Sequence, residues 1–333
     1  MNLTSKAIMI VMIFPTVGGV LALLWLALVP PEKEAPYRFV TAWGQEGSGP
    51  GEFRDPTGIA VSGSGAGSEV FVADARNARI QVFDLGGNFK RQFGRPGKGV
   101  GELGRPMNLT VFGGELYVAE YWNDRIQVFG LDGTPKRIIG GPGSGPGQFK
   151  APGGVAVAAN GDLFVADFYN QRIQRLKADG TFIRQWGTTG AVGIGAGQFN
   201  YPTDVALGAE GVLYVADGYN DRIQTFAADG EFLGKWGGPF AMNIWGPFRG
   251  WFATVTALAV DAAGNVFAAD FYNNRVQKFS ADGSFRTAFG EEGTGPGRMA
   301  HAMGVAVADD GSVFVADFAN NRITKWRPQG EGG

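Results

Sequence analysis

One pattern of apolar and polar positions recurs along the chain. Residues 163–176 read LFVADFYNQRIQRL, an apolar run, a polar turn and a second run in which apolar and polar residues alternate. Short apolar runs and period-two alternation, bounded by turn residues, are typical of β-strands. The pattern predicts two antiparallel strands joined by a tight turn, with Asp167 ending the first strand and Arg172 beginning the second.

The pattern occurs six times, at residues 70–83, 116–129, 163–176, 213–226, 266–279 and 313–326. Its acidic residue recurs at intervals of 46 to 53 residues, and a strand-only period of this length is the signature of β-propeller blades. A run of small apolar residues such as 154–157 precedes each pair, and an outer strand such as 182–187 follows it across an Asp-Gly turn in three copies. Each period therefore predicts one four-stranded blade.

The sixth copy ends at residue 326 without an outer strand, but residues 38–44 (RFVTAWG) fit the outer-strand pattern and precede the first blade. We expect this N-terminal strand to complete the last blade, since such closure protects the sheet edges. The prediction is an all-β, six-bladed propeller over residues 37–328, with a disordered tail at 329–333.

The motif P-x-G-[IV]-A-V followed by VADxxNxRIQxF resembles the NHL repeat. The resemblance covers nearly the whole chain from residue 37, and it implies a six-bladed NHL propeller. It leaves the function open, because NHL propellers serve as RNA-binding modules, as protein-docking platforms and as the sensor of a bacterial receptor kinase, and a related group are amidating lyases. The lyases require several histidines, whereas this chain has only His301.

Residues 7–29 form a run of 23 residues without a charge, after a six-residue tail and before the linker 30–36 (PPEKEAP). As a helix the run would span about 35 Å, enough to cross a bilayer. A cleaved signal peptide is the alternative, but the run exceeds the usual 7–15 apolar residues and no convincing cleavage site follows it. Charges flanking the run are nearly balanced, and the short tail favours a cytoplasmic N-terminus with a periplasmic or extracellular propeller.

Composition removes several classes of function. The chain has no Cys, which excludes disulfides, Cys-ligated zinc and a thiol nucleophile. One His excludes metal sites with two or three His ligands, and the formal net charge of −2 disfavours nucleic acid as a partner. We expect no cofactor and no metal site; a calcium ion at Asp204, Asn108 and Glu120 would need a denser acidic cluster.

An acidic residue and an Arg five positions later recur in every copy, and we interpret them as structural ion pairs because fold-level features repeat whereas functional sites are local. The pairs are Asp74–Arg79, Glu120–Arg125, Asp167–Arg172, Asp217–Arg222, Asp270–Arg275 and Asp317–Arg322.

Residues that differ between copies are better candidates for a site. The position before the repeated Asn is aromatic in four copies, which predicts either a broken aromatic ring on one face or packing between turns. Asn108, Asp204 and His301 lie near the starts of inner strands and could meet at the mouth of the axial channel. The four aromatic residues are Trp122, Tyr169, Tyr219 and Tyr272.

An apolar insert at 237–256 separates the fourth and fifth copies. Either it folds over its own blades, or it is a partner-docking loop or a lid, because aromatic residues, Met and Arg are enriched at interface hot spots. Strand alternation puts the insert on the face of the tyrosine turns and the linker on the opposite face. The candidate residues are Phe240, Met242, Ile244, Trp245, Phe248, Arg249, Trp251 and Phe252.

These observations favour a membrane-anchored, extracytoplasmic NHL propeller that docks a protein or an envelope ligand, as an accessory subunit of a membrane complex. A small molecule is a further possible ligand. The alternative is a propeller hydrolase or lyase whose site is the channel mouth, which would depend on Asn108, Asp204 and His301.

Overall fold

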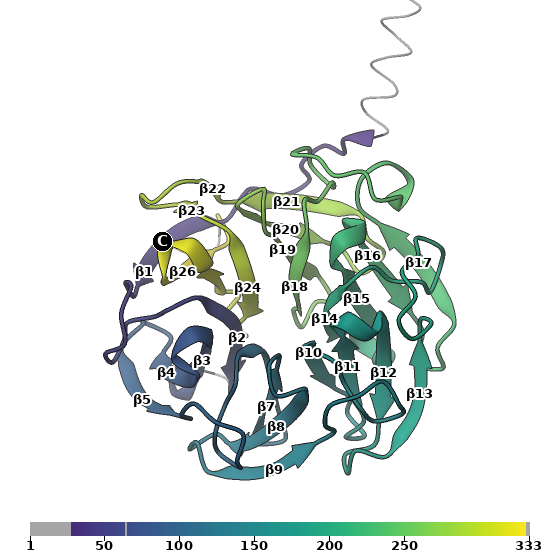
Figure 1. Ribbon diagram of the computed structural model, residues 1–333. Coiled ribbons are helices and arrows are strands. Elements are labelled where there is room, and N and C mark those ends of the chain that lie inside the picture. The colour runs from purple at the N-terminus through teal and green to yellow at the C-terminus, as the bar shows by residue number, and fades with distance from the viewer. Residues whose placement is uncertain (1–27, 64, 331–333) are drawn as a thin grey trace, which may run out of the picture.

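The computed structural model describes residues 28–63 and 65–330. In this part of the chain, six four-stranded antiparallel sheets are arranged around a central axis, each with its first strand innermost (Figure 1). The predicted all-β, six-bladed propeller is confirmed.

The strands follow the predicted order within each blade, from the axis outward. Blades 1 and 2 consist of β2 (Pro56–Ser62), β3 (Glu69–Asp74), β4 (Arg79–Asp84), β5 (Phe89–Phe93), β6 (Pro106–Phe112), β7 (Glu115–Glu120), β8 (Arg125–Gly130) and β9 (Pro135–Ile139). Blades 3 and 4 consist of β10 (Pro152–Val157), β11 (Leu163–Asp167), β12 (Arg172–Leu176), β13 (Phe182–Trp186), β14 (Pro202–Leu207), β15 (Leu213–Asp217), β16 (Arg222–Phe226) and β17 (Phe232–Trp236). Blades 5 and 6 consist of β18 (Val255–Val260), β19 (Val266–Asp270), β20 (Arg275–Phe279), β21 (Phe285–Phe289), β24 (Ala302–Val307), β25 (Val313–Asp317), β26 (Arg322–Arg327) and β1 (Arg38–Trp43).

Short elements lie in the turns and connections. They are β22 (Glu291–Glu292), which pairs in parallel with β23 (Arg298–Met299), and the 3₁₀ turns η1 (Gly65–Gly67), η2 (Ala75–Asn77), η3 (Phe168–Asn170), η4 (Ala209–Gly211), η5 (Gly218–Asn220), η6 (Pro239–Ala241) and η7 (Phe318–Asn320).

The ring closes through the N-terminal strand, as predicted. β1 pairs antiparallel with β26, from Arg38 opposite Arg327 to Trp43 opposite Ile323. Tyr37, which precedes β1, is buried and stacks on Phe289 of blade 5 at 4.8 Å. The last blade therefore contains strands from both ends of the described chain.

Apolar side chains pack mainly between neighbouring blades, so the core is itself a ring. The six core clusters each join two adjacent blades; one, for example, joins Phe83 of blade 1 to Phe314 of blade 6. The loop that leads into each blade, here called the connector, contains a residue with no exposed surface. These residues are Phe53, Leu103, Phe149, Phe199, Phe252 and Met299.

Inner strands approach one another closely, which explains their small residues. A Cβ atom on Gly304 would lie 2.0 Å from the carbonyl oxygen of Thr57 in the next blade. Thr57 in turn donates its hydroxyl to the Pro106 carbonyl of blade 2 at 2.9 Å. Glycine is therefore required at 304, because any side chain there would push two blades apart.

The predicted membrane-spanning run at 7–29 lies outside the described residues except for Leu28 and Val29. From Leu28 to Gly330, residue 64 aside, no helix has the length and apolarity needed to cross a bilayer. The linker at 30–36 is described, and it runs along the outer edge of blade 5, where the Lys33 backbone N–H donates to the Arg286 carbonyl at 2.8 Å.

Candidate functional site

Each repeated acidic residue is the centre of a buried hydrogen-bond network. In blade 3, Oδ2 of Asp167 accepts from Arg172 Nε at 2.8 Å, Asn170 Nδ2 at 2.9 Å and Gln174 Nε2 at 3.1 Å. Oδ1 accepts from the Lys150 backbone N–H at 2.7 Å, in the connector that enters the blade. The carboxylate thus fixes both the tight turn and the connector.

The arginine of each pair extends the network to connector carbonyls. Nη2 of Arg172 donates to the carbonyl oxygens of Gly145 and Gln148 at 2.8 and 2.9 Å. All six pairs form, at 2.7 Å for Asp74–Arg79, 2.6 Å for Glu120–Arg125, 2.8 Å for Asp167–Arg172, 2.7 Å for Asp217–Arg222, 2.8 Å for Asp270–Arg275 and 2.7 Å for Asp317–Arg322. We call this unit the clamp; its polar groups are committed to holding the backbone.

Burial affects the clamp carboxylates. It raises the pKa of Asp167 and Asp217, and it raises that of Asp270 to about 6, while the paired arginines oppose the change. The pairing therefore offsets only part of the desolvation cost, as expected for ion pairs removed from water.

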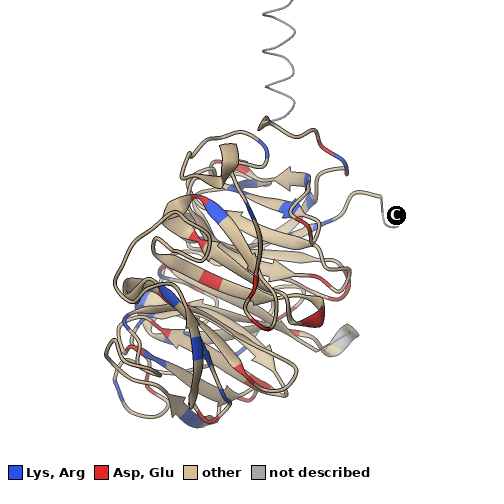
Figure 2. Ribbon diagram, turned by 90° about the vertical axis from the view of Figure 1, so that its right-hand side faces the viewer, with Lys and Arg blue, Asp and Glu red and all other residues tan. Residues whose placement is uncertain are grey.

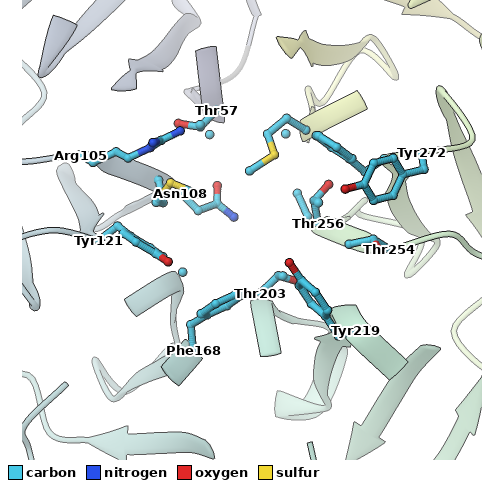
Figure 3. Close-up of a pocket in the computed structure, with 17 residues that line it drawn as sticks. Thr57, Arg105, Asn108, Tyr121, Phe168, Thr203, Tyr219, Thr254, Thr256 and Tyr272 are labelled. Carbon is cyan, nitrogen blue, oxygen red and sulfur yellow. The ribbon is translucent and has the colours of Figure 1, made fainter. Parts of the chain in front are cut away.

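A cavity of about 330 Å³ opens on the ring axis at the face of the tyrosine turns (Figure 3). Its inner wall comes from the starts of the inner strands and includes Thr57, Asn108, Thr203 and Thr256. Its outer wall has larger, mostly aromatic side chains. They are those of Arg105, Tyr121, Phe168, Tyr219, Phe271 and Tyr272, together with the smaller Thr254. Figure 3 shows the hydroxyl groups of Tyr219 and Tyr272 directed toward the open centre.

Aromatic side chains surround one side of this cavity, and we call them the aromatic arc. The distance between ring centroids is 5.9 Å from Tyr121 to Phe168, 4.9 Å from Phe168 to Tyr201 and 5.0 Å from Tyr201 to Tyr219. The arc consists of Tyr121, Trp122, Phe168, Tyr169, Tyr201, Tyr219, Phe271 and Tyr272, all carried by blades 2 to 5 and their connectors.

The four aromatic residues predicted from the repeat are the exposed members of the arc. Trp122, Tyr169, Tyr219 and Tyr272 are 44 to 62% exposed. Across the axis, the equivalent positions hold Arg76, which pairs with Asp55 at 3.0 Å, and Ala319. The aromatic surface is therefore one-sided.

Sequence reasoning missed the inner members of the arc. Tyr121, Phe168 and Phe271 occupy the position two before the repeated Asn, and Tyr201 lies in a connector. The first three belong to one column of the repeat, which also holds the partly buried Phe318 of blade 6, so comparing that column between copies would have found them. Tyr201 carried no such signal.

Asn108 lines the cavity, whereas Asp204 and His301 are not among its lining residues. Asp204 is 1% exposed, and its Oδ2 accepts from the Leu258 backbone N–H at 2.8 Å, whereas Oδ1 has no well-formed hydrogen bond among the described residues. Burial raises the pKa of Asp204 to about 7, opposed by backbone N–H groups and by the Asn108 amide. His301 instead stacks on Phe271 with ring centroids 4.4 Å apart.

Metal ligands are not grouped in the described chain. Within residues 28–63 and 65–330, no cluster of three or more His, Asp or Glu side chains could hold an ion. Glu120 is committed to its clamp with Arg125, so it is not available beside Asp204.

The insert divides into two parts. Gly246 donates its N–H to the Phe252 carbonyl at 3.1 Å, just as Gly47 donates to Phe53 at 3.0 Å in the connector of blade 1. Residues 246–252 are thus an ordinary connector, and the predicted insert was too long. Phe252 has no exposed surface and belongs to the core, so its inclusion among partner-binding residues was wrong.

The first part of the insert is exposed. Phe240 is 79% exposed and Trp245 is 70% exposed, while Met242 and Ile244 are about half exposed. Phe248 and Trp251 pack edge to face at 5.0 Å and, like Arg249, are partly buried. Only residues 240–245, which we call the insert tip, present apolar side chains to solvent.

The expectation that linker and insert lie on opposite faces was wrong. Trp251 donates its indole N–H to the Leu28 carbonyl at 2.5 Å, so the residue just before the linker contacts the connector that follows the insert tip. The prediction assumed that outer strands run parallel to the axis. Blades twist, and Figure 1 shows the outermost strands following the circumference, so the linker reaches the rim beside the insert rather than the far face.

Comparison with known proteins identifies the repeat. The model of the NHL repeat matches residues 149–176, 199–226, 252–279 and 300–326, which correspond to blades 3 to 6. The chain is a six-bladed propeller with NHL repeats. This NHL propeller is 36% identical over 92 residues to Protein brain tumor of Drosophila melanogaster and 38% identical over 88 residues to the B-box type zinc finger protein ncl-1 of Caenorhabditis elegans.

Each match covers only a limited part of this chain and of the relative. They span 27% and 23% of this chain and 9% and 10% of the relatives, so the chain matches about a tenth of the length of either relative. Among solved structures, a streptogramin B lyase superimposes over 87% of this chain and 98% of its own, with a TM-score of 0.59 and 17% identity. That likeness shows the shared propeller fold.

Proposed function

We propose that this NHL propeller is a docking module that binds a protein partner through the aromatic arc and the axial cavity. Residues 7–29 would hold it at a membrane as an accessory subunit, with the propeller on the periplasmic or extracellular side. NHL propellers are suited to protein interaction, and the chain lacks the basic excess that nucleic acid requires: Figure 2 shows Lys and Arg interspersed with Asp and Glu.

The observation that carries the proposal is the one-sidedness of the mouth. Six blades share one clamp and one backbone path, yet at the turn position before the repeated Asn exposed aromatic side chains occur only on blades 2 to 5. Blades 1 and 6 form the same four-stranded sheets with Arg76 and Ala319 at the equivalent positions, so the fold itself does not require an aromatic residue there. Exposed Tyr and Trp around a concave apolar centre are typical of binding hot spots.

The arc also has the rigidity that a docking surface needs. Trp122 lies under the Arg105 guanidinium, whose carbon is 5.7 Å from the ring centroid, and Lys150 lies 5.9 Å from the Tyr169 ring. Aromatic side chains held by neighbours lose little conformational entropy when a partner binds. The cations at the rim favour a partner segment with acidic or carbonyl groups beside an apolar anchor.

The test is co-purification of the full chain in mild detergent, followed by affinity measurement with the partner that is identified. The variant Tyr169→Ser/Tyr219→Ser/Tyr272→Ser should weaken that partner at least 30-fold, on the scale of about 2 kcal/mol for a hot spot. The matched control is Ile183→Ser/Leu233→Ser, which changes exposed apolar residues on outer strands and should leave affinity unchanged. Equal affinity of both variants would refute the proposal.

An enzymatic use of the cavity is the second candidate. Asp204 supports it in part, because a carboxyl group with a pKa near 7 suits general acid–base chemistry, but this side chain is buried and is not among the residues that line the cavity. His301 stacks on Phe271 rather than joining Asn108 and Asp204, so the chemistry would rest on two groups. Docking is therefore the better-supported function.

A further inference from the structure

The insert tip exposes apolar side chains in a way that the other connectors do not. Four of its six residues are large and apolar, namely Phe240, Met242, Ile244 and Trp245, and they are 45 to 79% exposed. Ordinary connectors expose fewer such residues, namely Val100 before blade 2 and Val192 with Ile194 before blade 4. A contiguous apolar protrusion of this kind marks a contact with a partner or with lipid.

The tip is held outward by its backbone. Ala241 is buried, and its carbonyl accepts from Arg222 Nη1 at 3.3 Å. With its amide nitrogen facing inward, Asn243 donates to Asp221 Oδ2 at 3.1 Å and to the Tyr219 carbonyl at 3.0 Å. These two attachments at 241 and 243 alternate with the exposed side chains of Phe240, Met242, Ile244 and Trp245.

The tip lies beside the start of the linker. A hollow of about 440 Å³ is bounded by Leu28 and Pro30 on one side and by Phe240, Ala241 and Trp251 on the other. Figure 1 shows the insert and the segment that begins at Leu28 together at one edge of the ring. Residues before Leu28 are without a charge back to residue 7, so the most apolar stretch of the chain leads to the insert.

Trp251 is placed to fix this relationship. At the equivalent connector position, Glu52 accepts from the Gly49 backbone N–H at 2.9 Å, and Glu102, Gln148 and Gln198 do the same in their own connectors. Trp251 cannot accept such a bond, and instead it donates to the Leu28 carbonyl. Further along the linker, Glu34 pairs with Lys278 at 2.6 Å, so the linker is attached at several points.

Basic side chains lie next to the apolar tip. Lys33 and Lys235 line the same hollow, and Arg249 follows it in the connector. Aromatic residues beside Lys and Arg are the combination found where proteins meet the bilayer interface, with rings among the headgroups and cations at the phosphates.

We propose that the insert tip is a second membrane-contact element, which enters the headgroup region of the bilayer that residues 7–29 enter. This inference rests on the membrane part of the proposed function. The ring would stand with the rim of blades 4 and 5 on the membrane, and the aromatic arc would remain open to a partner.

The absence of native Cys allows a direct depth measurement on the full chain. Single Cys residues replace Phe240, Met242 or Trp245, carry a nitroxide, and are placed in nanodiscs of phosphatidylcholine and phosphatidylglycerol. Matched controls are Val100→Cys and Val192→Cys, at 58 and 57% exposed positions in ordinary connectors. We expect the tip labels to be at least fivefold less accessible than the controls to a water-soluble nickel chelate, and more accessible to oxygen.

Chelate accessibility equal to that of the controls would overturn the inference. If the chain incorporates into the discs and still gives this result, only the proposed contact of the insert tip is refuted. If the chain never incorporates into the discs, the proposed membrane anchor is refuted as well. Labels that are shielded only after a protein partner is added would assign the tip to that partner. As a second variant, Phe240→Ser/Trp245→Ser should return a label at Met242 to the aqueous value while thermal unfolding changes little.

Discussion

The connectors before blade 1 and blade 5 follow the same backbone path but carry different side chains at equivalent positions. In the first, Arg79 Nη2 donates to the Gly49 and Glu52 carbonyls at 2.8 and 2.9 Å. In the second, Arg275 Nη2 donates to the Phe248 and Trp251 carbonyls at 2.7 and 3.0 Å. The clamp tolerates an insertion and an aromatic substitution because it binds backbone atoms, so side chains at connector positions are free to take other roles.

The largest expected effect comes from removing the clamp itself. Asp74→Ala and Asp270→Ala should each lower the free energy of unfolding by about 3–5 kcal/mol, because a buried guanidinium and several donors lose their acceptor. Urea unfolding of the two variants measures this. Similar losses would confirm that both connectors depend on one frame, and a tolerated Asp270→Ala would show that the insert is held by other contacts.

Asp310→Ala is the matched control for the clamp. Asp310 pairs with Arg327 at 2.9 Å, but the side chains are 38 and 44% exposed. Its removal should change the free energy of unfolding by less than about 1 kcal/mol, since water screens exposed pairs.

A smaller, pH-dependent effect concerns Asp204, which has no arginine partner among the described residues. Burial raises the pKa of Asp204 to about 7 from 3.8, so between these values the folded state binds more protons than the unfolded state. The contribution of Asp204 to stability should therefore fall as pH rises from about 4 to 7, with a slope approaching about 1.4 kcal/mol per pH unit.

Asp204→Asn should remove that slope. Unfolding curves of wild type and variant between pH 4 and 8 give the difference, which isolates Asp204 from the other buried carboxylates. Parallel curves would contradict a raised pKa at this residue.

The smallest expected effect tests the substitution that distinguishes the two connectors. Trp251→Glu restores the residue type of the blade 1 connector and should change stability by only about 1 kcal/mol, because the new carboxylate can cap the turn as Glu52 does. A spin label at a Cys replacing Leu28 should become more mobile, since the Leu28 carbonyl loses its donor. Trp245→Glu, which changes the exposed tip instead, should leave that label unchanged.

The features that repeat between the six copies could be predicted from the sequence, whereas those that occur in only one place could not. Six copies of one pattern located the blades and the Asp–Arg pairs, and the missing outer strand of the last copy located β1. The register of the insert was readable as well, since Gly250 and Phe252 match Gly51 and Phe53, but its apolar character hid this match.

Two features of the site depend on geometry that no repeat encodes. The contact between Trp251 and Leu28 follows from the circumferential course of the outer strands, which is a consequence of accumulated sheet twist. The burial of Asp204 follows from the close approach of Gly154 in the neighbouring blade. A Cβ atom on Gly154 would lie 2.0 Å from Oδ1 of Asp204. Spacing along the chain could place Asp204 near the axis, but it could not show that one oxygen lacks a partner.

Because β1 pairs with β26, the ring cannot close until β26 has been synthesised. At about 5–20 residues per second, β1 leaves the ribosome roughly 15 to 60 seconds before its neighbour exists. During that interval blade 1 has no blade 6 to cover Phe83, and residues 38–43 present an unpaired edge. Ring closure must therefore wait until β26 has been synthesised and has left the ribosome, and the edge of residues 38–43 stays open to other pairing until then.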